Sequence, residues 1–175
     1  PFIWDGTQNI IIDISYADYT GSVILQADLS ATNQTIISGD NDYFLDFEGW
    51  DYIDVPKDAF NTIDSAITIS FWQYGNPDIQ PINSSIFEGV DSLGRRVLNA
   101  HLPWSNGKVY WDAGFDGSDR IFRQASASDY EGQWNFWTFI KDARSGRMQI
   151  LLNGNLWFVG SGRTKLMNNV EEFRI

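Results

Sequence analysis

The 175-residue chain contains no cysteine, which excludes disulfides and cysteine-based metal sites. It has no apolar run close to the ~20 residues of a membrane-spanning helix, and patterns with helical periodicity are scarce. Basic residues are also few: 12 Lys and Arg stand against 23 Asp and Glu, for a net charge of −11. Because nucleic acids and anionic membranes bind clustered Lys and Arg, we expect neither as a partner.

The acidic balance also bears on sugar ligands. Like charges repel, so acidic polysaccharides are disfavoured unless a bound cation or a local arginine patch intervenes. Neutral sugars and cations fit this charge better. No secretion signal is visible and Pro1 is not a natural start, so we expect a module excised from a larger protein.

What the sequence does contain is a succession of short strand patterns. In Ala66–Tyr74, Ile67, Ile69 and Phe71 alternate with more polar residues, as in a strand with one buried face. The turn signals Asn106-Gly107 and Asn153-Gly154 follow strand patterns. Strands are predicted over 44–48, 52–55, 66–74, 97–102, 108–113, 134–141, 147–152, 155–160 and 171–175, with single helical turns over 56–60 and 125–130. Strands at this spacing indicate an all-β, antiparallel two-sheet sandwich, with residues 1–175 as one domain.

Several segments carry a family resemblance: FLDFEGWDYIDVP (44–56), HLPWSNGKVYWDAG (101–114), DRI (119–121), YEGQWNFWTFIKDARSGRMQILLNGNLW (130–157) and VEEFRI (170–175). Over residues 40–175 the chain resembles bacterial laminin-G-like domains of the concanavalin A-like superfamily. The resemblance implies a jelly roll of two curved antiparallel sheets, attached to a secreted or cell-surface protein such as a polysaccharide-degrading enzyme or an adhesin. Such domains bind glycans or proteins, and some hold calcium. Residues 1–39 match no motif, and we expect an edge strand and a crossing loop there.

Aromatic side chains stack on the apolar faces of sugar rings, and this chain has eight tryptophans. In the strand 108–113, Tyr110 and Asp112 share one face, and the carboxylate indicates that this face is wet. We therefore predict a ligand site on the concave face, formed by Trp72, Arg96, His101, Trp104, Tyr110 and Asp112. The alternative is that most tryptophans are core residues and that His101, the only histidine, is a hydrogen-bonded structural residue.

Calcium is the predicted cofactor, because it binds six to eight carboxylate and carbonyl oxygens. No EF-hand loop is present. Related folds hold calcium at the sheet edge between an early acidic loop and the last strand, which here implies Asp40, Asp42, Asp46 and Glu171. The alternative is a solvated acidic surface.

Catalysis is not expected. The paired-carboxylate strand of retaining glucanases, E-x-D-x-E or E-x-D-x-x-E, is absent, as is the G-x-S-x-G motif. Arg95-Arg96, Asn99-Ala100-His101 and 109–114 only faintly resemble the motifs of alginate-lyase-like jelly rolls. The first hypothesis is a non-catalytic carbohydrate-binding module, the second a protein-interaction or structural module, and the third a polysaccharide lyase or glycoside hydrolase.

Overall fold

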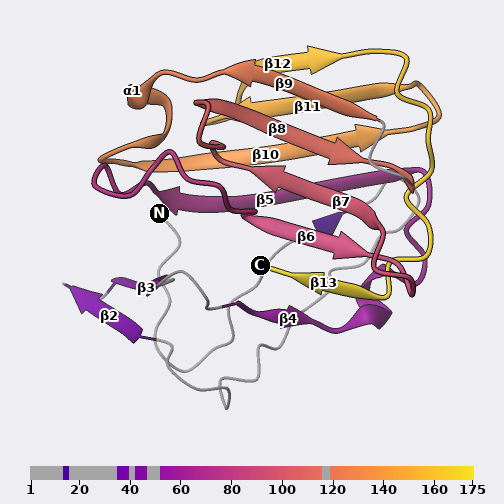
Figure 1. The fold of residues 1–175 in the computed structure, drawn as a ribbon, viewed down its shortest axis with the longest axis horizontal. Helices are drawn as coiled ribbons and strands as arrows, with labels where there is room; N and C mark the ends of the chain where they lie inside the picture. The colour runs from indigo at the N-terminus through magenta and orange to yellow at the C-terminus, as the bar shows by residue number, and fades with distance from the viewer. Residues whose placement is uncertain (1–13, 16–34, 40–41, 47–51, 116–118) are drawn as a thin grey trace.

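The computed structural model describes the backbone of residues 14–15, 35–39 and 42–46, and both backbone and side chains of 52–115 and 119–175. Two antiparallel sheets lie face to face, with the six-stranded sheet toward the viewer in Figure 1 and the five-stranded sheet behind it. The predicted all-β jelly-roll sandwich is therefore confirmed. No helix among the described residues is long and apolar enough to cross a membrane.

The five-stranded sheet has the order β1 (Ile14–Ser15), β5 (Ala66–Tyr74), β10 (Trp134–Asp142), β11 (Arg147–Leu152) and β12 (Asn155–Gly160). Matching rows of buried apolar residues set its register. Ile69 of β5 pairs with Phe139 of β10, which pairs with Ile150 of β11, and all three are buried. A slip of one residue would turn this apolar row out of the core.

The six-stranded sheet has the order β4 (Asp54–Val55), β13 (Glu172–Arg174), β6 (Phe87–Val90), β7 (Arg96–His101), β8 (Lys108–Ala113) and β9 (Arg120–Gln124). Sequence reasoning did not find β6 and β9. β6 is four residues long and includes Gly89, whose missing side chain leaves room for Phe173 and Leu98. β9 is an edge strand with one buried residue, Ile121, so its alternation is weak.

The core between the sheets is aromatic. Phe87 makes ring contacts with Trp111, Phe139 and Phe173 at centroid distances of 5.7 Å, and Trp111 Nε1 donates to the carbonyl of Ile140 in the opposite sheet over 3.0 Å. Truncating such a ring to alanine typically costs about 3–5 kcal/mol. This packing fixes how the sheets lie on each other, and with it the side chains on their outer faces.

The connections agree with the predicted turns. Gly107 lies in the turn between β7 and β8, and Asn153 lies in the turn between β11 and β12. Both have positive φ, 74° and 52° respectively. The two predicted helical turns are present as the 3₁₀ helix η1 (Lys57–Phe60) and α1 (Ala127–Tyr130). Within 1–50, β1 lies at the edge of the five-stranded sheet, as expected, and β2 (Thr35–Gly39) pairs with β3 (Asp42–Asp46) as a separate hairpin.

Candidate functional site

The outer face of the six-stranded sheet brings together four aromatic rings on adjacent strands. His101 of β7 pairs with Tyr110 of β8, which pairs with Phe122 of β9. Trp104 lies in the β7–β8 turn, where its backbone N–H donates to the backbone carbonyl of Lys108 over 2.9 Å. We call Trp104, His101, Tyr110 and Phe122 the aromatic row.

The rings of the aromatic row contact one another in sequence. Centroid distances are 4.5 Å from Trp104 to His101, 5.8 Å from His101 to Tyr110 and 5.5 Å from Tyr110 to Phe122. Phe122 is 46% exposed, Trp104 and Tyr110 are half-buried, and His101 is buried. Asn106 donates to the Tyr110 hydroxyl over 2.8 Å and so holds this ring in place. Three partly exposed rings in a line offer a surface on which apolar ring faces can stack.

Ion pairs flank the aromatic row. Arg120 Nε and Nη2 each donate to one oxygen of Asp112 over 2.6 Å, and the guanidinium carbon lies 5.0 Å from the Tyr110 ring centroid. The bond to Asp112 raises the pKa of Arg120. Asp112 is fully buried, so the interpretation of a wet face is wrong at this residue, because Arg120 covers the carboxylate. Arg96 forms a second pair with Glu88 at 2.7 Å.

His101 is held in place through one ring nitrogen. Its Nδ1 lies 2.8 Å from the Ser84 carbonyl oxygen, an acceptor that requires the proton on Nδ1. Burial lowers the pKa of His101; the bond to Ser84 opposes this, and the charge of Arg96 adds to it. These contacts match the structural interpretation, with the imidazole supporting Trp104 and Tyr110.

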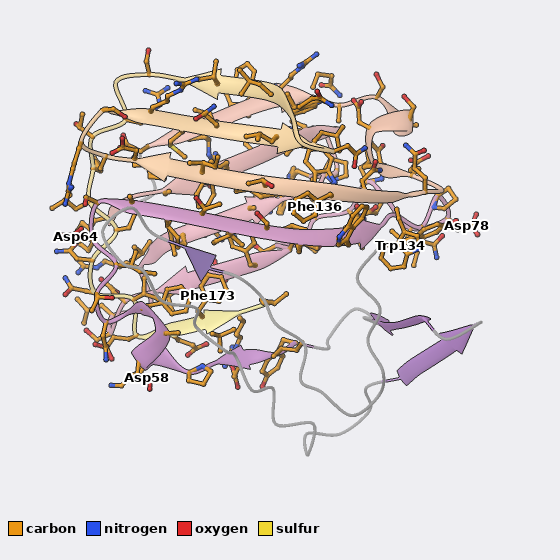
Figure 2. All side chains as sticks on the ribbon, turned by 180° about the vertical axis from the view of Figure 1, so that it is seen from behind. Asp58, Asp64, Asp78, Trp134, Phe136 and Phe173 are labelled. Atoms are coloured by element: carbon orange, nitrogen blue, oxygen red, sulfur yellow. The ribbon has the colours of Figure 1, made fainter. Side chains whose placement is uncertain are left out.

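Trp72 does not join the other five predicted ligand residues. Trp72 lies on β5, on the outer face of the five-stranded sheet. The prediction that it shares a site with the other five residues is therefore wrong. There Trp72 contacts Phe136 at 5.2 Å and Tyr74 contacts Trp134 at 5.7 Å; Figure 2 shows this face, with Phe136 and Trp134 labelled. Trp72 and Trp134 are 55% and 46% exposed, so this end of β5 and β10 is open to solvent.

The predicted calcium ligands lie mostly outside the described side chains. Asp40 is not described, and of Asp42 and Asp46 only the β3 backbone is. Glu171 is described and accepts a bond from Lys57 Nζ over 3.2 Å. Among the residues with described side chains, no three His or carboxylate groups cluster as a metal site would require. Calcium therefore stays a prediction.

A pocket of about 330 Å³ lies where β9 and β12, edge strands of the two sheets, meet; Figure 1 shows these strands side by side at the top. It is lined by Arg120, Ile121, Phe122, Phe158, Gly160 and Arg163. Beside it, Arg123 lies 4.8 Å from the Trp157 ring centroid and donates to the Trp157 carbonyl. No sequence pattern marked this pocket, because its residues come from β9 and from β12 and the segment just after it, more than thirty positions further along the chain.

The arrangement on this face suits binding better than proton transfer. Glu88, Asp112 and Asp54 are each engaged in an ion pair with an arginine. His101 has one ring nitrogen engaged with Ser84. The described part of the face thus offers stacked rings and fixed donors.

Neither a protein-family model nor a curated protein matches this sequence. Solved structures do. The chain is similar to domain 4 of AbnA, a GH43 extracellular arabinanase from Geobacillus stearothermophilus, in complex with arabinotriose, at 15% identity and a TM-score of 0.57 over 85% of this chain and 68% of that chain.

Two neurotoxin structures are similar as well. The binding domain of botulinum neurotoxin serotype G matches at 20% identity and a TM-score of 0.54, over 85% of this chain and 40% of that chain. The binding domain of botulinum neurotoxin DC in complex with SialylT matches at 16% identity and a TM-score of 0.53, over 82% and 37%. The chain thus spans less than half the length of these two domains. At such identities the likeness shows the fold alone, a two-sheet antiparallel β-sandwich, which is the fold that the sequence resemblance implied.

Proposed function

We propose that this protein is a non-catalytic carbohydrate-binding module, and that the aromatic row on the six-stranded sheet is its ligand surface. The carrying observation is the line of Trp104, Tyr110 and Phe122, partly exposed and flanked by the ion pairs Arg120–Asp112 and Arg96–Glu88. The rings would stack on sugar faces, and the fixed guanidinium groups would donate to hydroxyls.

Two of the structurally similar proteins support a glycan as the ligand. The arabinanase domain is in complex with arabinotriose, and the neurotoxin domain is in complex with SialylT. We further propose that the module belongs to a larger secreted or cell-surface protein, where it would raise the local concentration of its partner domain on a polysaccharide. A neutral glycan is the first candidate, given the net charge of −11.

A second candidate function is protein interaction. The observation that favours it is the exposed group Trp72, Tyr74 and Trp134 on the opposite sheet. Exposed apolar patches on soluble domains mark interaction surfaces. The two candidates use different faces, so one pair of variants separates them.

The test measures binding by isothermal titration calorimetry against a panel of neutral oligosaccharides that includes arabinotriose. We expect Phe122→Ala to weaken binding about tenfold or more, as loss of an aromatic anchor does at interfaces. Tyr74→Ala is the matched control, because it removes an exposed ring from the other sheet, and it should leave affinity unchanged. Loss of binding in Tyr74→Ala alone would move the glycan site to the five-stranded sheet, and no binding to any glycan would refute the proposal.

A further inference from the structure

The edge pocket between β9 and β12 continues the aromatic row. Arg120 and Phe122 line the pocket, and the same two residues contact Tyr110. A chain of sugars lying along the row would therefore reach the pocket at the end of the sheet. Its volume of about 330 Å³ is in the range of small-molecule sites.

The polar side chains that line this pocket are all cationic. Arg120 donates two of its N–H groups to Asp112. The Nε of Arg163, in contrast, is buried and has no hydrogen-bond partner within the described part of the chain. The backbone N–H of Arg163 donates to the Gly146 carbonyl over 2.9 Å, which fixes the base of this side chain. A buried donor without an acceptor is costly, so the guanidinium would gain by turning toward an acceptor in the pocket that Arg163 lines.

The rest of the pocket wall is apolar, formed by Ile121, Phe122, Phe158 and the backbone at Gly160. A Cβ at Gly160 would overlap Cγ2 of Ile121, so the close approach of the two strands depends on glycine at this position. Apolar walls beside a guanidinium suit a ring that has an apolar face and carries a carboxylate, because arginine binds carboxylates with paired donors.

Local charge at this edge differs from the net charge of the chain. Two carboxylates lie near this edge, and each forms an ion pair with a basic side chain: Asp112 with Arg120, and Asp119 with Lys141. The paired cations balance their negative charges. Arg123 adds a further positive charge beside Trp157. Since charges beyond about 8 Å are screened at physiological salt, distant acidic residues act only weakly on a ligand here.

We infer that the β9–β12 edge pocket binds a carboxylate-bearing sugar residue through Arg163, so that the glycan recognised by the aromatic row is an acidic one. This inference rests on the proposed function and names its substrate class. The net charge of the chain favours a neutral glycan, but a local arginine patch can still attract an acidic one. The arginines at this edge form such a patch.

The experiment compares three pairs of ligands that differ in charge: oligogalacturonate and its methyl ester, oligoglucuronate and its methyl ester, and sialyllactose and lactose. The first two pairs test uronic acids as the source of the carboxylate, and the third pair tests sialic acid. We expect the wild type to bind the acidic member of at least one pair about tenfold more tightly or better, as charge-assisted hydrogen bonds do. This preference should shrink between 0.15 M and 1 M salt, owing to screening.

Three variants assign the preference to the pocket. Arg163→Gln should abolish the preference for the acidic member, and Arg163→Lys should keep part of that preference. Arg174→Gln is the matched control, because it removes the same charge from β13, which three strands separate from β9. Urea midpoints of all variants would verify folding.

The outcomes separate this inference from the proposed function. A wild type that binds both members of every pair equally, or a preference that survives Arg163→Gln, overturns the acidic ligand and leaves the glycan-binding proposal in place. A wild type that binds no member of any pair and no glycan of the neutral panel overturns both.

Discussion

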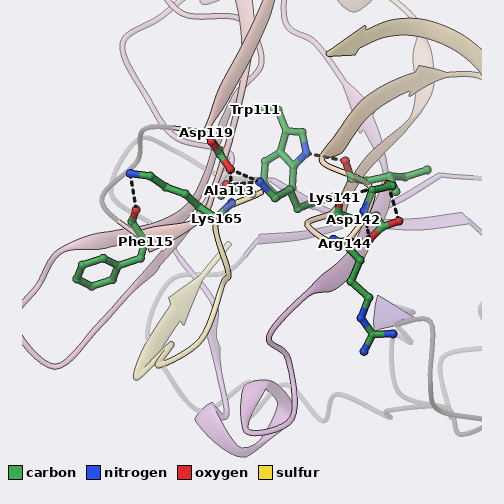
Figure 3. A network of polar contacts seen from close by, with 10 residues as sticks. Trp111, Ala113, Phe115, Asp119, Lys141, Asp142, Arg144 and Lys165 are labelled. Carbon is green, nitrogen blue, oxygen red and sulfur yellow. Dashed lines mark hydrogen bonds and ion pairs between the residues drawn. The ribbon is translucent and has the colours of Figure 1, made fainter. Parts of the chain in front are cut away.

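The buried ion pair between Lys141 and Asp119 makes the strongest stability prediction. Lys141 Nζ lies 2.6 Å from Asp119 Oδ2 and also donates to the Ala113 carbonyl over 3.1 Å, as Figure 3 shows. The Lys141 side chain is fully buried and that of Asp119 is 9% exposed. Burial lowers the pKa of Lys141, an effect that the bond to Asp119 opposes. The pair joins β10 of one sheet to the residue that precedes β9 of the other.

Asp119→Asn keeps the side-chain shape but removes the counter-charge from a buried ammonium. Breaking one partner of a buried pair costs about 3–5 kcal/mol, a large share of the roughly 5–15 kcal/mol by which domains are stable. For a domain of this size the melting temperature should fall by roughly 6–20 °C. Urea denaturation and calorimetry would measure both quantities.

A matched control at an exposed ion pair and a double variant at the buried pair test whether the buried charge causes the loss of stability. Asp54→Asn breaks an exposed pair with Arg174 and should cost under about 1 kcal/mol. Lys141→Met combined with Asp119→Asn should recover much of the loss, because a neutral apolar replacement no longer buries a lone charge. If Asp119→Asn costs no more than Asp54→Asn, the buried-charge argument is refuted.

Three further predictions concern pH, packing and calcium. Since burial lowers the pKa of His101 below 6.5, the neutral ring stabilises the fold above that pH and this contribution is lost as pH falls through the folded-state pKa. Urea midpoints from pH 8 to 5 should therefore show the stability gap between wild type and His101→Gln narrowing, and a constant gap would contradict this. Gly75→Ala should destabilise by roughly 2 kcal/mol or more, because its Cβ would overlap the Tyr130 carbonyl oxygen; an unchanged melting temperature would count against it. Calcium should raise the melting temperature relative to chelator, and Glu171→Gln should reduce that rise; equal melts with and without calcium would remove the metal from the account.

The sequence predicted most of the fold because its signals are local. The alternation in Ala66–Tyr74 and the Asn-Gly turns determine strands and hairpins from neighbouring residues. β6 and β9 were missed for a physical reason: both are short, and neither carries enough alternating apolar residues to stand out. Their pairing is determined by the strands on either side.

The candidate site was predicted only in part, for a related reason. Alternation within one strand placed Tyr110 and Asp112 on one face correctly, but it cannot relate one strand to another sheet. Trp72 was therefore grouped with residues from which the core separates it. Arg163, in contrast, carries no local pattern, and only the meeting of β9 and β12 gives it a place in a pocket.

The position of β13 has a consequence for how the protein folds during synthesis. This strand lies inside the six-stranded sheet, between β4 and β6, and pairs with both. Until Arg174 has left the ribosome, β4 and β6 cannot be joined, and Phe173 cannot take its place against Phe60 and Phe87. The sheet would therefore close only after β13 has emerged, and deleting residues 172–174 would remove an interior strand and leave two unpaired edges exposed to aggregation.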